Sequence, residues 1–230
     1  MNWFLEPALS FLELGGPVVV ILTGLSVIAL AIIGLKLFGF MSLRVGMHSE
    51  VKSALELWQE NNQIGALRSL RGSKSPVGKC LAVAMQRISS GQEFKEDIED
   101  AVQTTAVKEL HELQRGFRAL EAIAQISPLL GLFGTVLGMI DAFQKLQSAG
   151  NSVDPSILAG GIWVALLTTA AGLAVAMPVS LVLTWFETRV DDERITIQTM
   201  VNSLINTNTD FAAPNMEDGK PVAAVAAHAN

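Results

Sequence analysis

Three long apolar stretches dominate the pattern of hydrophobic and polar positions along this chain of 230 residues. They cover residues 17–40, 122–147 and 157–186. A helix rises ~1.5 Å per residue, so about 20 residues cross a hydrocarbon core of ~30 Å. The pattern predicts an all-α integral membrane protein with three transmembrane helices. A buried helix of a soluble core is the alternative for any single stretch, and the Ser127-Pro128 pair interrupts the middle one.

Residues 41–121, between the first two stretches, alternate amphipathic runs with turn signals. Runs at 51–60 and 77–89 have helical periodicity, and Asn61-Asn62, Gly72-Ser73 and Ser75-Pro76 separate them. Residues 95–124 carry one apolar stripe with steps of three and four: Ile98, Val102, Ala106, Leu110, Leu113, Phe117, Leu120 and Ala124. No breaker precedes Ser127-Pro128, so we expect a single helix to run from this segment into the second span.

The third stretch continues into a charged but still periodic segment, residues 187–210. Its apolar face consists of Val190, Ile195, Ile197, Met200, Val201, Leu204 and Ile205. We therefore expect the third membrane helix to extend out of the membrane. Residues 1–16 and 148–156 are predicted to lie outside the membrane, and residues 211–230, which lack periodicity, to form a disordered tail.

The distribution of Lys and Arg predicts how the helices are oriented. Residues 1–16 contain neither, whereas most of the chain's Lys and Arg lie in 41–121 and the rest flank or follow the spans. Positive charge close to a span marks the cytoplasmic side of a membrane. We expect residues 1–16 and 148–156 on the outer side, and residues 41–121 and the C-terminus in the cytoplasm.

The remaining composition narrows the function classes. The net charge is −6, which gives no reason to expect nucleic acid as a partner. The single cysteine, Cys80, excludes an internal disulfide, and no haem or zinc pattern is present. His48, His111 and His228 are scattered, with no nucleophile or metal-ligand spacing around them. We expect neither an enzyme nor a bound metal or cofactor.

Small residues recur at helical spacing in the second and third spans. The glycines among them are Gly131, Gly134, Gly138, Gly161 and Gly172. In lipid, where burying apolar surface gives little drive for association, small residues let two helices approach closely. Helix packing is therefore the expected role of these glycines.

Three threonines near the middle of these spans suggest a further role. Thr135 lies in the second span, and Thr168 and Thr169 lie in the third, which runs in the opposite direction. Their hydroxyls could thus meet at a similar depth, although a lone membrane threonine often bonds its own backbone one turn back. No ionisable residue lies deep in either span, and Asp141 is near the outer end. A proton path normally needs such a group, so a partner would have to supply the carboxylate.

Two ordered motifs carry a family resemblance. Residues 127–143 read SPLLGLFGTVLGMIDAF, and residues 159–178 read AGGIWVALLTTAAGLAVAMP. They resemble the MotA/TolQ/ExbB proton-channel family, and its ExbB branch most closely. The resemblance implies an inner-membrane homopentamer around a dimer of ExbD-like single-span helices, whose membrane aspartate carries the proton. Such a motor drives a TonB-like protein and so energises uptake across the outer membrane. The TolQ branch, which works with TolR and TolA, is the alternative.

The resemblance also assigns roles to single residues. Thr135 and Thr169 match the family threonines implicated in the proton path, beside which Thr168 lies, and the proton is the coupling ion. Val164 is a departure, because relatives usually have a glutamate there, and a valine cannot titrate. Weaker conduction, different coupling and a dispensable glutamate all remain open. A self-sufficient channel or transporter would need a filter, a charged ring or an inverted repeat, and a passive scaffold is the third hypothesis.

Overall fold

The computed structural model describes residues 5–91, 94–148 and 155–207. Within these ranges every regular element is an α-helix, and three helical stretches are long and apolar enough to cross a membrane: Gly16–Ser42, Lys95–Ser148 and Leu158–Thr207. The prediction of an all-α membrane protein with three spans is confirmed. The predicted disordered tail and most of the predicted outer loop lie outside the described residues.

The helices form two units, which are considered separately. The first contains residues up to 46 together with 108–194, and the second contains 47–107 together with the chain from 195 onward. The first unit holds the membrane-spanning parts of the three long helices. The second holds the three shorter helices together with the helical residues 95–107 and 195–207.

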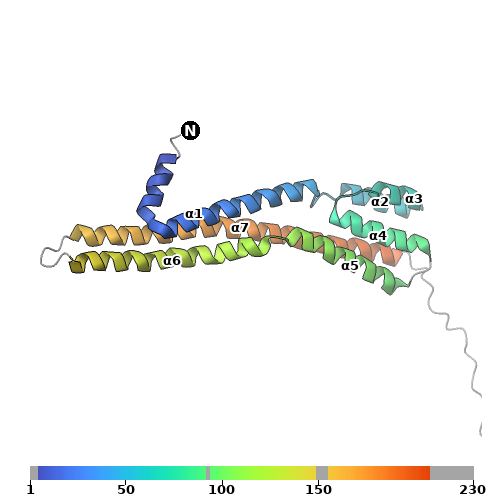
Figure 1. The fold of residues 1–230 in the computed structure, drawn as a ribbon. Coiled ribbons are helices and arrows are strands. Elements are labelled where there is room, and N and C mark those ends of the chain that lie inside the picture. The colour runs from blue at the N-terminus through green and yellow to red at the C-terminus, as the bar shows by residue number, and fades with distance from the viewer. Residues whose placement is uncertain (1–4, 92–93, 149–154, 208–230) are drawn as a thin grey trace, which may run out of the picture. The chain divides into compact units, whose positions relative to one another are not determined.

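Helix α1 (Leu5–Ser42) opens the first unit and changes direction once. Gly16 has φ 64° and ψ −165° inside the helical range, and Pro17 follows it. A positive φ of this kind suits glycine, and the residue before a proline is sterically excluded from the helical region. The Gly16-Pro17 pair therefore separates a short N-terminal helical piece from the membrane-spanning piece (Figure 1).

Helices α6 (Phe117–Ser148) and α7 (Pro155–Thr207) lie side by side along the first unit (Figure 1). Helix α7 runs without a break for 53 residues, which confirms that the third span continues into the charged segment. The predicted interruption at Ser127-Pro128 is wrong, because α6 passes through Pro128 as a helix. Membrane helices tolerate such a proline where neighbouring groups satisfy the freed backbone.

The expected single helix from residue 95 into the second span is also wrong at one point. Helix α5 (Lys95–Gln114) ends before α6 begins, and Gly116 between them has φ 94°. The left-handed backbone of Gly116 ends α5 in the manner of a glycine C-cap. The apolar stripe nevertheless continues across the break, since Leu113, Phe117 and Leu120 are all buried.

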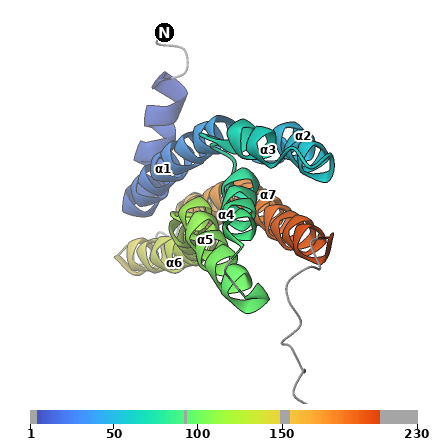
Figure 2. The same cartoon turned by 90° about the vertical axis from the view of Figure 1, so that its right-hand side faces the viewer.

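The second unit contains a small bundle of α2 (Ser49–Gln59), α3 (Gln63–Leu70) and α4 (Pro76–Ser90), which lie together in Figure 2. The predicted runs at 51–60 and 77–89 correspond to α2 and α4, but α3 was not foreseen. Asn61 has φ 62°, and the side chain of Asn62 caps α3 by accepting from the Gly65 N–H at 2.9 Å. The buried core consists of Val51, Ala54, Trp58, Ala66, Leu70, Val77, Cys80, Leu81, Ala84 and Met85.

Candidate membrane site

The seam between α6 and α7 is built from small side chains at helical spacing. The buried residues of this seam are Ser127, Gly131, Gly134 and Ala142 on α6, and Ala165, Thr168, Gly172 and Ala176 on α7. Successive members are three, four or more residues apart, so each set lies on one face of its helix. The two small faces meet along the membrane-spanning length of the pair.

The backbones approach so closely at this seam that no side chain would fit at several glycines. A Cβ atom on Gly172 would lie 2.5 Å from the Ser127 carbonyl oxygen, and one on Gly131 would lie 2.9 Å from the Thr168 carbonyl oxygen. A Cβ atom on Gly138 would lie 3.3 Å from the Ala165 backbone nitrogen, and one on Gly161 would overlap the Ala142 Cβ. In lipid such packing supplies much of the attraction between helices.

The two adjacent threonines of α7 converge on one backbone carbonyl of α6. The Thr168 hydroxyl donates to its own helix at Ala165 O, 2.7 Å away, and lies 3.3 Å from Gly131 O. The Thr169 hydroxyl lies 3.4 Å from the same Gly131 oxygen. A hydroxyl has one proton to donate, so Thr168 bonds mainly at the nearer carbonyl and Thr169 reaches across the seam. Gly131 O is thus the point at which hydroxyls from α7 meet α6.

Thr135 does not join that cluster by a hydrogen bond. Its hydroxyl donates to Leu132 O at 2.6 Å, within its own helix, and its side chain is only half-buried. Gly131 and Thr135 are one turn apart, about 6 Å along the axis, so the three threonines lie at similar depth. The structure therefore brings Thr168 and Thr169 together and leaves Thr135 beside them on a partly open face.

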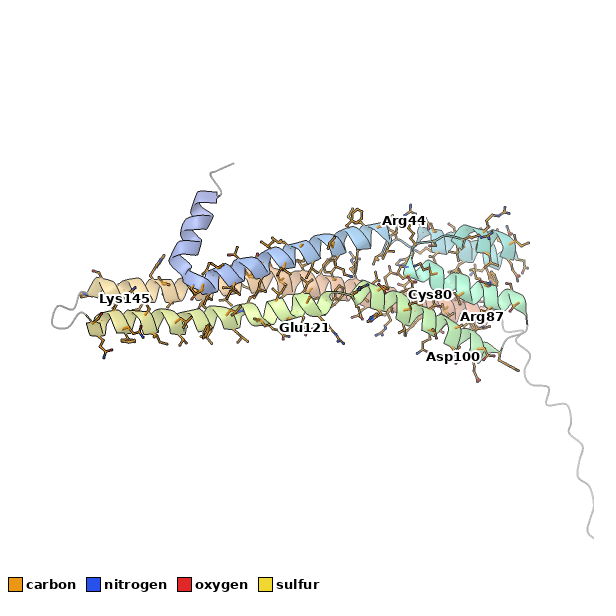
Figure 3. All side chains as sticks on the ribbon, in the orientation of Figure 1. Arg44, Cys80, Arg87, Asp100, Glu121 and Lys145 are labelled. Carbon is orange, nitrogen blue, oxygen red and sulfur yellow. The ribbon has the colours of Figure 1, made fainter. Side chains whose placement is uncertain are left out.

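Charged groups are excluded from the depth at which these hydroxyls lie. Along α6 none occurs between Glu121 and Asp141, and the latter pairs with Lys145 at 2.8 Å near the helix end (Figure 3). Along α7 none occurs before Glu187. Val164 is a half-buried aliphatic side chain. The site offers hydroxyl and carbonyl dipoles but no proton acceptor that titrates.

Two charged side chains of the first unit have roles that the sequence did not reveal. Lys36 lies within the first apolar stretch, and its Nζ donates to the Glu112 and Leu113 carbonyls at 3.3 and 3.1 Å. It lies 5.8 Å from the Phe117 ring and so caps α5 at the break. Glu193, 1% exposed, accepts the backbone N–H of Gly46. The only feature of the sequence that could have indicated the role of Lys36 is that it is an isolated charge within an apolar stretch.

A metal centre is not formed by the side chains that the structure describes. Among residues 5–91, 94–148 and 155–207 no three His, Cys, Asp or Glu side chains gather closely enough to bind an ion.

Comparisons with known proteins identify the family. The model of the MotA/TolQ/ExbB proton channel family matches residues 72–199, more than half of the chain. An ExbB homolog of the biopolymer transport type from Methanothermobacter thermautotrophicus is 30% identical over 201 residues, which are 83% of this chain and 69% of that protein.

Two further relatives cover shorter parts of the chain. Biopolymer transport protein exbB1 of Vibrio cholerae is 37% identical over 141 residues, 60% of each chain. The Tol-Pal system protein TolQ of Haemophilus influenzae is 39% identical over 71 residues, 31% of each chain. The matched family region contains both seam motifs and all three threonines. By this match and by its three-span helical fold, the chain belongs to the MotA/TolQ/ExbB proton channel family.

Proposed function

We propose that this chain is a motor subunit of the ExbB type, driven by the proton motive force. It forms a homopentamer in the bacterial inner membrane around an ExbD-like dimer of single-span helices, and energises a TonB-like protein for uptake across the outer membrane. Its N-terminus is periplasmic and its C-terminus cytoplasmic, in agreement with the excess of Lys and Arg between the first two spans.

One observation carries this proposal: a membrane site with hydroxyls but no ionisable group, in a family of proton channels. Thr135, Thr168 and Thr169 lie at similar depth, while the membrane parts of α6 and α7 contain no acid or base there. Proton transfer through a membrane normally uses an ionisable side chain. A partner helix therefore has to bring the carboxylate, and the partly open face carrying Thr135 is where we place it.

The first experiment identifies the partner. The chain is purified with its native complexes preserved, and the co-purifying single-span protein is sequenced for an aspartate within its membrane helix. The chain reconstituted alone is expected to conduct protons poorly and the complex to conduct well. An intact ring that never contains such a partner would contradict the proposal, and so would full conduction by the chain alone.

The second experiment tests the threonines. Thr135→Ala and Thr169→Ala are expected to impair coupled uptake while the complex still assembles. Thr184→Ala is the matched control, because the exposed Thr184 hydroxyl also bonds its own helix, at Ser180 O, 3.0 Å away, but beyond the seam. Normal iron–siderophore uptake in both seam variants would remove these residues from the proton path.

A TolQ-type role in the Tol-Pal envelope system is the second candidate. The similarity to the Haemophilus influenzae TolQ protein favours it, although over a shorter stretch than the ExbB-named relatives. The two roles are separated by the partner: a TolR-like protein and outer-membrane defects after deletion indicate the TolQ role. Lost uptake with an intact envelope indicates the ExbB role.

A further inference from the structure

Helix α6 leaves one backbone carbonyl without its helical donor. The helix runs through Pro128 without a break, and proline has no N–H. The carbonyl of Ala124, one turn earlier, therefore lacks the hydrogen bond that closes each turn of an α-helix. The Ser127 hydroxyl donates to Ile123 O, 2.6 Å away, and no other side chain that the structure describes donates to Ala124 O. An unsatisfied carbonyl is costly in a membrane span, so this oxygen is open to a donor from outside the chain.

This carbonyl belongs to the face of α6 that carries Thr135. Ala124 and Thr135 are 11 positions apart, which at about 100° per residue is three turns and roughly 20° more. Pro128 and Gly131 lie between them on the same face. Ala124, Pro128 and Thr135 are half-buried, so this face borders the seam without being enclosed by it. We call residues 124, 128, 131 and 135 the small stripe.

The first ionisable side chain on the inner side of the small stripe is Glu121. It precedes Ala124 by three residues, about 4.5 Å along the helix axis and about 60° around it. Its exposed carboxylate lies at the start of the apolar part of α6 (Figure 3). One of its oxygens accepts from Gln125 Nε2 at 3.2 Å, and no Lys or Arg that the structure describes pairs with it. The carboxylate thus keeps an oxygen available for a proton.

Helix α7 contains the same parts, but they do not share one face. Pro178 frees the carbonyl of Ala174, which lies about 140° around the helix from Thr169. The first acid beyond it, Glu187, is again about 140° away from Ala174. Of the two helices of the seam, α6 is therefore the one that aligns a threonine, a freed carbonyl and an acid.

We infer that the small stripe carries the inner end of the proton path, with a water molecule bound at the Ala124 carbonyl and Glu121 as the proton acceptor beyond it. The inference rests on the function proposed above, in which a partner's carboxyl group lies near Thr135 and the inner side is the cytoplasm. Water continues along the small stripe between Thr135 and Ala124, a distance of about 16 Å.

Each transfer along this path moves one proton and changes no other group. The water at Ala124 gives a proton to the Glu121 carboxylate and receives another from the side of Thr135, while its remaining hydrogen stays bonded to the carbonyl. Glu121 then releases its proton to bulk water and is again a carboxylate. A group that exchanges protons through one intervening water meets the geometric requirement for a general base.

The first experiment tests for water at Ala124 and does not depend on proton conduction. Ala124→Cys and Ile126→Cys are made in the full-length protein, which is purified with its bound chains retained. The two positions lie at nearly the same depth on opposite sides of α6, and Ile126 is 47% exposed. A charged thiol reagent needs water and a thiolate, so Ala124→Cys should react about tenfold faster. Unmutated protein, in which Cys80 is buried, gives the background.

The second experiment measures proton flux through the reconstituted complex. Glu121→Gln keeps the size of the side chain and removes the acceptor, so flux should fall about a hundredfold, the lower end of what a positioned proton-transfer group contributes. Azide, a small weak acid when protonated, should restore flux by taking the proton instead. Pro128→Ala supplies an N–H to the Ala124 carbonyl in place of the water. Flux should then fall about fivefold, the weight of one hydrogen bond, and azide should not restore it.

Glu187→Gln and Pro178→Ala are the matched controls on α7, and both should leave flux unchanged. Normal flux in either α6 variant overturns the inference and leaves the proposed function standing. A loss of equal size in the α7 controls also overturns it. So does a Glu121→Gln defect that azide does not relieve, because that result would give Glu121 a structural role.

Two further results count against the inference. Equal reactivity of the two cysteines, or protection of Ala124→Cys by a bound chain, would show that protein or lipid and not water covers the freed carbonyl. A complex that conducts no protons even without substitutions would overturn the inference together with the proposed function, and this result distinguishes the two failures.

Discussion

The α6–α7 seam and the α2–α4 bundle solve the same packing problem with opposite residue types. The seam brings glycine against backbone, with Gly131 and Gly172 in contact with carbonyl oxygens of the opposite helix. The bundle fills its interior with large side chains, such as Trp58, Leu81 and Met85. Close contact between backbones holds α6 and α7 together, whereas the volume of buried side chains holds α2, α3 and α4 together.

The difference follows from what surrounds each region. Water drives large apolar side chains together, so the α2–α4 bundle gains free energy from burying them. Lipid is as apolar as leucine and provides no such drive, so α6 and α7 gain mainly from close van der Waals contact and from polar groups across the seam. Removing methyl groups should therefore destabilise the α2–α4 bundle, and adding a methyl group should destabilise the α6–α7 seam.

The largest effect is expected in the bundle. Leu81→Ala removes a side chain with no exposed surface and should lower the free energy of unfolding by about 3 kcal/mol, within the usual range for a cavity in a core. Chemical denaturation measures it, followed by the fluorescence of Trp58 in a background in which the other three tryptophans, Trp3, Trp163 and Trp185, are replaced by Phe. Ile64→Ala, on the exposed side of α3, should change little; equal losses in both variants would show that the bundle has no specific core.

The reverse change is expected to break the seam. Gly172→Ala adds one methyl group 2.5 Å from the Ser127 carbonyl oxygen, so the helices must separate, at a cost of about 2 kcal/mol. Gly160→Ala is the matched control on the same helix, because nothing lies within 4 Å of the added atom. The midpoint of unfolding in denaturing detergent should fall only for the first; a fall of equal size in both would attribute the effect to helix propensity.

A smaller effect is expected at the cap between α1 and α5. Lys36→Met keeps the side-chain length but leaves the Glu112 and Leu113 carbonyls without their donor, which should cost about 1 kcal/mol. Hydrogen exchange of the last turn of α5 should rise. Lys36→Arg should restore most of the protection, and unchanged exchange in Lys36→Met would mean that Gly116 alone ends the helix.

The smallest effect is expected at the buried Thr168 hydroxyl, which bonds mainly within its own helix. Thr168→Val keeps the shape of the side chain and removes its hydrogen bonds to Ala165 O and Gly131 O, which should cost about 0.6 kcal/mol. Thr168→Ser retains the hydroxyl and should therefore keep the hydrogen bonding that Thr168→Val removes. It should lose the packing of the threonine methyl group against Gly134. A loss above that of Gly172→Ala would make hydrogen bonding the main force at the seam.

Much of the fold could be predicted from periodicity, because each buried face repeats with the helix. The stripe from Ile98 to Leu120 and the extension of α7 are both where the pattern indicates them. The break at Gly116 was missed because the stripe runs straight through it, and only the backbone angle distinguishes it. Helix α3 was missed because eight residues between two turns are too few for periodicity to stand out.

The residues that form the site could be predicted from the sequence, but the hydrogen bonds that they make could not. Sequence spacing indicated that the threonines of two antiparallel spans lie at similar depth, and it could not show which atom each hydroxyl meets. Thr169 reaches the carbonyl of Gly131, while Thr135 bonds within its own helix. The register between two helices depends on how closely the small residues let them approach, which is a property of the pair and not of either sequence.

The contact between Gly134 and Thr168 restricts how these two positions can vary among related sequences. A Cβ on Gly134 would lie 2.6 Å from the Thr168 hydroxyl oxygen, so the two positions share one volume. Related chains should vary them together: alanine at 134 requires glycine at 168, because the Thr168 Cβ would also lie only 2.7 Å from the added atom, and any larger residue at 168 keeps glycine at 134. Residues 134 and 168 are therefore sterically coupled, and a larger residue at one position requires a smaller one at the other.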